Sequence, residues 1–205
     1  MRPAYVGDGA RVLDFDCENR PLSYLGQDFT TSEITAIAWA FIPPEGKKVK
    51  VSVSVLGVTC QHGRCRQVHN GDSFEDMLCI FREQYERADL LTGHNIRTHD
   101  LRILNGMYVE LGMPPLPPKL TEDTYRDLHK KSGVSGSQES LAAMLGVGAP
   151  KVSMAQVDWR TANRLTPEGI AKARLRCVGD VLQHVELRRE LLDRGWLHGP
   201  RVWAG

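Results

Sequence analysis

Residues 11–18 constrain the fold more than any other part of the sequence. Apolar and acidic residues alternate there, in the order Leu13, Asp14, Phe15, Asp16, Cys17 and Glu18. A period of two is the pattern of a β-strand, and it places the three carboxylates on one face. Like charges side by side on a strand repel each other, so water or a cation must offset the repulsion. The segment is therefore either an edge strand with a solvated acidic face or a strand whose acids hold a divalent ion.

The other periodic segments predict an α/β fold, with one domain over residues 1–205. Strands are expected over three further segments, at residues 34–42, 48–58 and 88–91. Helices are expected after the N-cap Ser73, with Asp76 as its capping partner, and over residues 99–111, 121–131 and 139–145.

The last predicted helix is the longest. It begins with the N-cap Thr166 and with Pro167 at its first position. We expect its buried stripe to consist of the regularly spaced apolar residues Ala171, Leu175, Val178, Leu182, Val185 and Leu192.

Composition excludes several classes of protein. Hydrophobic residues at 41% and charged residues at 25% are globular values, which excludes a disordered chain. Lys+Arg number 26 and Asp+Glu 25, so the chain has no general excess of basic residues for binding polyanions. The longest apolar run, residues 36–42, is far shorter than the ~20 residues that span a bilayer. The N-terminus has no apolar run of the kind found in a signal peptide. We therefore expect a cytoplasmic protein that has no membrane partner.

Two more acids stand in suggestive contexts. Asp100 follows Gly93-His94-Asn95 and falls in the first turn of a predicted helix, and Asp180 lies in the long final helix. Each has a simpler explanation, Asp100 as an acid favoured by the helix dipole and Asp180 as an exposed boundary residue.

Together these segments resemble the three motifs of the DnaQ-like (DEDD) 3′–5′ exonucleases. The motifs are Asp16-Cys17-Glu18, then Gly93-His94-Asn95 with Asp100, and finally Cys177-Val178-Gly179-Asp180-Val181. The resemblance runs from about residue 11 to residue 192. Residues 119–128 are similar to the segment that follows the second motif, and residues 140–146 to the short helix before the third.

The resemblance implies a ribonuclease H-like fold, a mixed β-sheet flanked by α-helices. It also implies two Mg²⁺ or Mn²⁺ ions and four residues that are both catalytic and metal-binding, namely Asp16, Glu18, Asp100 and Asp180. Asp16 would bridge the ions, Glu18 and Asp180 would complete the tighter site, and Asp100 would serve the second ion. His94 and Asn95 would orient their loop or contact the terminal nucleotide.

The implied activity is 3′–5′ exonucleolytic hydrolysis of single-stranded or frayed DNA. The chain has no polymerase-sized region, so a proofreading role would need a separate polymerase as partner. The alternatives are an exoribonuclease of the same family and a nucleic-acid-binding or polymerase-accessory module with weakened catalysis.

One departure from the family pattern favours the last alternative. The family has a His or Tyr four or five residues before the last Asp, whereas this chain has Arg176 and Leu175. Arginine cannot accept a proton near neutral pH, and we expect Arg176 to contact the substrate. Either the metal suffices to activate water, or another histidine such as His99 or His184 serves, or the protein binds without cutting. His184 is expected on the opposite side from the usual base and receives no role.

Two other features remain open. Four possible zinc ligands, Cys60, His62, Cys65 and His69, lie within ten residues, and an incidental loop explains them better than a zinc knuckle does. Residues 160–201 carry nine Lys/Arg against five Asp/Glu, which suits either a phosphate-binding face or a solvated helix face.

Overall fold

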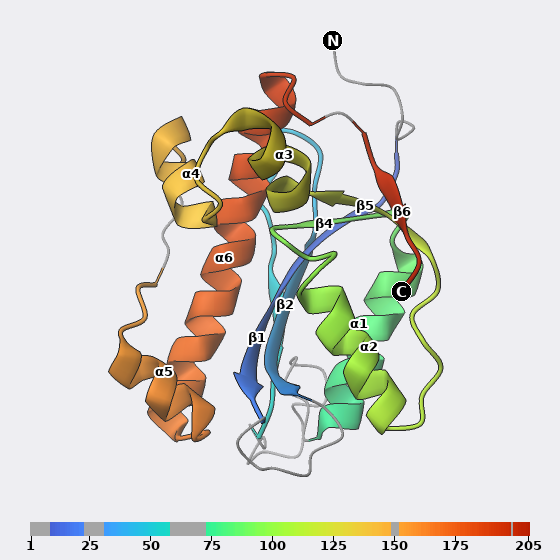
Figure 1. Ribbon diagram of the computed structural model, residues 1–205, viewed down its shortest axis with the longest axis vertical. Helices are drawn as coiled ribbons and strands as arrows, with labels where there is room; N and C mark the ends of the chain where they lie inside the picture. The colour runs from blue at the N-terminus through green and yellow to red at the C-terminus, as the bar shows by residue number, and fades with distance from the viewer. Residues whose placement is uncertain (1–8, 23–30, 58–72, 149–151, 198) are drawn as a thin grey trace.

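A six-stranded mixed sheet lies at the centre of the computed structural model, which describes residues 9–22, 31–57, 73–148, 152–197 and 199–205 (Figure 1). Its strands are β1 (Val12–Pro21), β2 (Ser32–Phe41), β3 (Ser52–Val55), β4 (Leu90–Gly93), β5 (Lys119–Asp123) and β6 (Arg201–Trp203). They are ordered β3-β2-β1-β4-β5-β6. The neighbours β1, β4 and β5 run parallel, and the other pairs are antiparallel.

Helices cover both faces of this sheet (Figure 1). They are α1 (Phe74–Arg87), α2 (Asp100–Glu110), α3 (Thr124–Ser132), α4 (Gln138–Leu145), α5 (Gln156–Asn163) and α6 (Pro167–Asp193). The helices α1 and α2 pack on one face, and α6 crosses β1, β2 and β3 on the other. This α/β arrangement is a ribonuclease H-like fold, as predicted. No helix among the described residues combines the length and apolarity needed to cross a membrane.

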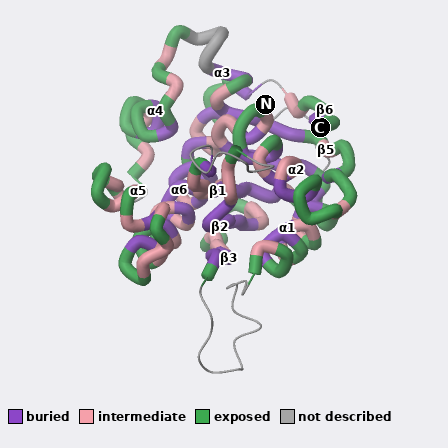
Figure 2. Tube along the Cα trace, turned by 60° about the horizontal axis from the view of Figure 1, so that its bottom comes forward, coloured by how far each residue is buried: buried purple, intermediate pink, exposed green. Residues whose placement is uncertain are grey.

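The alternation in β1 separates the two faces of the sheet. Leu13, Phe15 and Cys17 are buried in the cluster formed with α1 and α2. The intervening acids consequently point toward α6. The strands and the sheet-facing sides of the helices are buried, and the outer helix faces are exposed (Figure 2). The predicted N-cap of α1 is confirmed, because Ser73 Oγ accepts a hydrogen bond from the Asp76 amide.

The predicted stripe of α6 is wrong at its N-terminal end. Ala171 and Leu175 are exposed, whereas Ala173 is buried and Cys177 and Val181 are buried against the sheet. The residues of β2 that face this part of α6 are alanines. Their small side chains allow the helix to lie close to the sheet, so the helix buries small and polar residues there. A search for aliphatic spacing gives little weight to such residues.

Several element boundaries also differ from the expectations. The segment Lys119–Asp123 is strand β5, so the helix expected from residue 121 begins at Thr124. Pairing with β4 on one side and β6 on the other favours the extended conformation over local helix propensity. Strand β3 begins at Ser52 rather than at residue 48, and neither α5 nor β6 was expected.

Candidate active site

The acidic strand β1 is a central strand, with β2 on one side and β4 on the other. This position excludes the alternative of a solvated edge strand. The parallel pairing with β4 ends where Asp14 lies opposite Thr92. Asp16 and Glu18 therefore lie beyond the end of β4, at the carboxyl end of the parallel strands, where α/β sheets bind ligands.

Strand β2 leaves room above these acids. The partners of Asp14, Asp16 and Glu18 in β2 are respectively Ala40, Ala38 and Ala36. Directly opposed residues share a face, so each carboxylate has a methyl group as its cross-strand neighbour. Small neighbours allow α6 to pack closely over the strand and to bring its own acid to the carboxylates.

Helix α6 supplies that acid. Asp16, Glu18 and Asp180 each offer a carboxylate oxygen, and these oxygens lie within 4.8 Å of one another. We call these three residues the acidic cluster. Three carboxylate oxygens form a donor set suited to a hard divalent cation such as Mg²⁺ or Mn²⁺, so the residues present fit the metal that the fold family implies. Asp180 is buried, at 7% exposure, which excludes the alternative of an exposed boundary residue.

Asp100 lies beside the acidic cluster but is not a member of it. Asp100 is 2% exposed, and its Oδ1 accepts a hydrogen bond of 3.0 Å from the backbone amide of Cys17. Because Cys17 separates Asp16 from Glu18, Asp100 binds the backbone of β1 where β4 no longer does. The four predicted acids are thus gathered at one end of the sheet, three as possible ligands of one ion and Asp100 against the strand.

Arg176 provides a positive charge within the cluster. Its Nε lies 2.7 Å from Asp180 Oδ2 and 4.0 Å from Glu18 Oε1. Its Nη1 donates a hydrogen bond of 2.9 Å to the carbonyl of Val152. The residue at the family's His or Tyr position is therefore ion-paired with the acids themselves.

The loop after β4 is held by internal hydrogen bonds. His94 contacts Thr124 Oγ1 through Nδ1 at 2.9 Å and the carbonyl of Gly136 through Nε2 at 2.8 Å. Asn95 has a φ of 68°, a left-handed conformation that asparagine tolerates. Its backbone N–H donates a hydrogen bond to Asp123 Oδ1. These contacts correspond to the loop-orienting role among the two predicted for His94 and Asn95. A contact with a nucleotide stays a prediction.

The residues of β5 and α3 that hold this loop in place were not identified from the sequence. Asp123 caps α3 and also accepts hydrogen bonds from the amides of Asn95 and Arg97. Arg97 in turn contacts Asp127 at 2.6 Å. The cap of α3 was the signal available in the sequence, but the helix was predicted to begin too early for Asp123 to be its cap.

A second missed feature is a buried pair between β1 and α6. His184 Nδ1 lies 2.6 Å from Asp14 Oδ2, and Nε2 lies 2.9 Å from Thr124 Oγ1. Asp14 is 0% and His184 2% exposed. Burial raises the pKa of Asp14, and the neighbouring His184 and Arg188 lower it. Both ring nitrogens of His184 therefore contact buried protein groups, and its exclusion as the missing base stays a prediction.

His99 is the other histidine near the acids. Its Nδ1 lies 3.4 Å from Asp100 Oδ2, and its side chain is partly exposed. The hydrogen bond with Asp100 raises the pKa of His99, although burial lowers it. His99 therefore lies beside Asp100 rather than within the acidic cluster, and its use in place of the family's base stays a prediction.

Two buried cysteines, Cys17 and Cys177, lie next to the acids. Burial raises the pKa of Cys17 and of Cys177 well above the usual range, and neighbouring carboxylates add to the rise. In this structure both cysteines pack as small buried residues.

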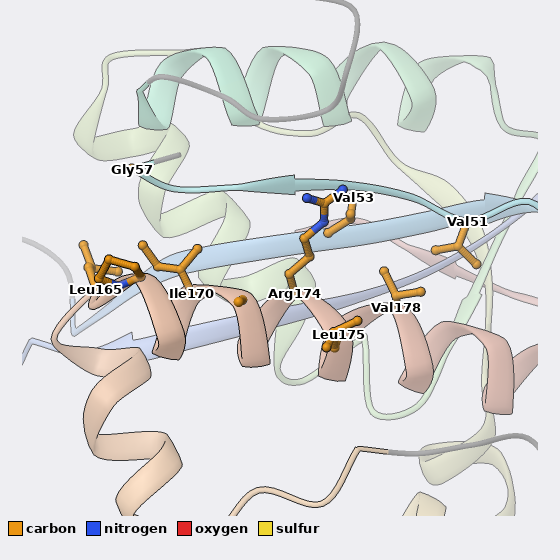
Figure 3. A pocket seen from close by; sticks show the side chains of 10 residues that line it. Val51, Val53, Gly57, Leu165, Ile170, Arg174, Leu175 and Val178 are labelled. Carbon is orange, nitrogen blue, oxygen red and sulfur yellow. The ribbon is translucent and has the colours of Figure 1, made fainter. Parts of the chain in front are cut away.

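A groove of about 900 Å³ lies on the other flank of α6, between this helix and β3. Val51 and Val53 form one wall, and Ile170, Leu175 and Val178 contribute to the other (Figure 3). The groove is mainly apolar and contains none of the acidic cluster.

The sequence left two features open, the basic residues of segment 160–201 and the four possible zinc ligands. The structure describes nearly all of the first and none of the second. Cys60, His62, Cys65 and His69 lie outside the described residues. In the basic stretch, Arg188 pairs with Glu122, Lys172 with Asp158 and Arg194 with Glu190. Internal pairing of these cations weakens the case for a continuous phosphate-binding face.

Comparisons with known proteins support the class of fold. No protein-family profile matches the sequence, and no curated protein does either. Among solved structures, the chain is similar to the family B DNA polymerase from the hyperthermophilic archaeon Pyrobaculum calidifontis, with a TM-score of 0.60 and 16% sequence identity. The match covers 89% of this chain and 24% of that chain, so the protein spans about a quarter of the polymerase's length. This similarity concerns the fold.

Proposed function

We propose that the protein is a metal-dependent 3′–5′ exonuclease of the DnaQ-like kind that acts on single-stranded or frayed DNA. The observation that carries the proposal is the convergence of Asp16 and Glu18 from β1 with Asp180 from α6. The similarity to a DNA polymerase favours DNA over RNA as the substrate class and a separate polymerase as the partner.

Each acid has a role in this proposal. Asp16, Glu18 and Asp180 hold the first divalent ion, and Asp100 serves the second while it fixes β1 through the Cys17 amide. Bound Mg²⁺ or Mn²⁺ supplies activation of water and neutralisation of the leaving 3′ oxygen. His94 and Asn95 hold the loop beside the acids, where the 3′-terminal nucleotide is proposed to bind.

The ion pair of Arg176 with Asp180 favours a second candidate function. An arginine at this position cannot accept a proton, and it neutralises part of the charge that attracts a metal. A nucleic-acid-binding or polymerase-accessory module with weakened catalysis is consistent with that contact.

The test is degradation of a 5′-labelled single-stranded DNA oligonucleotide, and of its RNA equivalent, with Mg²⁺ or Mn²⁺. We expect a ladder of shortened DNA that disappears with EDTA. Asp16→Asn should lower the rate by at least about a hundredfold, because the metal accounts for several kcal/mol of transition-state stabilisation.

Glu186→Gln is the matched control. Glu186 is an exposed acid on α6, so its replacement removes the same charge from the chain without touching the acidic cluster. The control should retain wild-type activity. Preferential degradation of RNA would identify an exoribonuclease. Intact DNA and RNA at high enzyme concentration and pH ~9, with binding retained, would select the non-catalytic module.

A further inference from the structure

Arg176 contacts two of the three carboxylates in the acidic cluster. The guanidinium lies 2.7 Å from Asp180 and 4.0 Å from Glu18, and its side chain is only 17% exposed. The hydrogen bond to the carbonyl of Val152 holds the far side of the guanidinium. The carboxylates and the carbonyl thus surround a cation that belongs to the chain.

A divalent ion in the acidic cluster and this guanidinium would both engage the carboxylate of Asp180. Mg²⁺ binds carboxylate oxygens at about 2.0–2.1 Å, and Arg176 Nε already donates a hydrogen bond of 2.7 Å to Asp180 Oδ2. The two positive groups would also lie a few ångströms apart in a partly buried site, where repulsion between charges is weakly screened.

The competitor is attached to the site. Arg176 and Asp180 are four residues apart on α6, the spacing at which helical side chains meet. A tethered group has a high effective concentration at its partner, so the guanidinium competes at any protein concentration.

We propose that Arg176 is the resident cation of the acidic cluster and that a divalent ion binds only when the guanidinium leaves Asp180. This inference rests on the metal-dependent function proposed above and adds how that function is restrained. When the metal concentration is low, the guanidinium of Arg176 neutralises part of the charge of the acidic cluster. Arg176 thereby raises the metal concentration that is needed to fill the site.

The experiment is a calorimetric titration of metal-free protein with Mn²⁺. We expect Arg176→Gln to bind Mn²⁺ at least about tenfold more tightly than the wild type, because the competing charge is gone. Arg176→Lys should lie between the two, since it keeps the charge but loses the planar arrangement of donors. Asp16→Asn in the Arg176→Gln background should abolish the tight binding.

Arg174→Gln is the matched control for charge. Arg174 is two residues away on α6 and lines the groove on the other flank of the helix (Figure 3). Arg174→Gln changes the net charge by the same amount as Arg176→Gln. We expect it to bind Mn²⁺ with the same affinity as the wild type. An equal gain in both glutamine variants would show a general charge effect and overturn the inference. Tight binding that survives Asp16→Asn would place the ion elsewhere and overturn it too.

Failure of the proposed exonuclease gives a different result. If no variant degrades DNA while Arg176→Gln binds Mn²⁺ more tightly than Arg174→Gln, the competition stands and the activity does not. If the wild type is active and its Mn²⁺ affinity is the same without Arg176, the activity stands and the competition does not.

A measurement on the wild type makes the test independent of variant folding. The Nε–H resonance of Arg176 should shift on titration with diamagnetic Mg²⁺, because its hydrogen bond to Asp180 Oδ2 is lost. The corresponding resonance of Arg174 should stay in place. An Arg176 resonance that does not move while the backbone amides of β1 do would mean that ion and guanidinium bind together, which contradicts the proposal.

Discussion

Asp14 and His184 show what a single buried contact contributes between β1 and α6. Both side chains are shielded from water, and their 2.6 Å contact joins the acidic strand to the helix that carries Asp180. A carboxylate at this depth is tolerated because His184 is its partner, with Arg188 contributing at longer range. The pair therefore stabilises the position of α6 over the sheet without taking part in the proposed chemistry.

His184→Ala should destabilise the fold by about 3–5 kcal/mol, because it leaves the Asp14 carboxylate buried without its partner. Denaturant unfolding followed by circular dichroism measures the change. Adding Asp14→Asn should cost less than the sum of the two single changes, since a neutral amide has less need of the histidine. Strict additivity would contradict a coupled pair.

The pair of Arg11 and Asp89 predicts a dependence of stability on pH. The Asp89 carboxylate accepts hydrogen bonds from the side chain and the amide of Arg11, and these hold the pKa of Asp89 far below its usual range. A lowered pKa stabilises the fold above the unfolded pKa of about 3.9, and the contribution is lost as the pH falls toward the folded pKa.

The unfolding midpoints of the wild type and of Asp89→Asn test this sign. The advantage of the wild type should be constant above about pH 5 and should shrink as the pH falls below about 3.9. Because the pair is solvent-exposed, the advantage should also decrease with added salt. A difference that is the same at pH ~6 and pH ~2.5 would contradict the assignment.

At the scale of elements, the packing of α5 against α6 depends on one glycine. A Cβ on Gly169 would lie 2.3 Å from the Thr161 carbonyl carbon and 2.4 Å from the Ala162 amide nitrogen. These are backbone atoms of α5, which cannot rotate away. The first turn of α6 therefore accepts no larger residue at this position.

Gly169→Ala should lower stability by about 1–3 kcal/mol, in spite of the helix propensity that alanine adds. Gly106→Ala in α2 is the matched comparison, because a Cβ there meets nothing within 4 Å. We expect it to raise stability by about 0.5–1 kcal/mol. Thermal unfolding of the two variants should give shifts of opposite sign, and a stabilised Gly169→Ala would contradict the packing.

The elements also show what local sequence can and cannot predict. The alternation of β1 and the cap at Ser73 are local signals, and both are confirmed. The extended conformation of Thr121 depends on pairing with two strands distant in sequence, so a helix was expected to begin there. The buried face of α6 was predicted correctly at Val185 but not at Ala173, Cys177 and His184, which are small or polar.

At the scale of the whole molecule, the candidate site is assembled from three distant segments. Asp16 and Glu18 come from β1, Asp100 from the start of α2 and Asp180 from α6. Sequence motifs pointed to all four acids, but motifs contain no distances. The ion pair of Arg176 and the contact of Asp100 with the Cys17 amide depend on side-chain positions that only the fold determines.

That last contact has a practical consequence. The amide proton between the two acids of β1 is donated to the carboxylate of Asp100, so its nitrogen and proton chemical shifts depend on the charge of that carboxylate. Binding of a cation near Asp100 will alter the strength of this hydrogen bond and move the Cys17 cross-peak. A single backbone resonance can therefore follow the electrostatic state of the site in the unmodified protein, in the absence of nucleic acid.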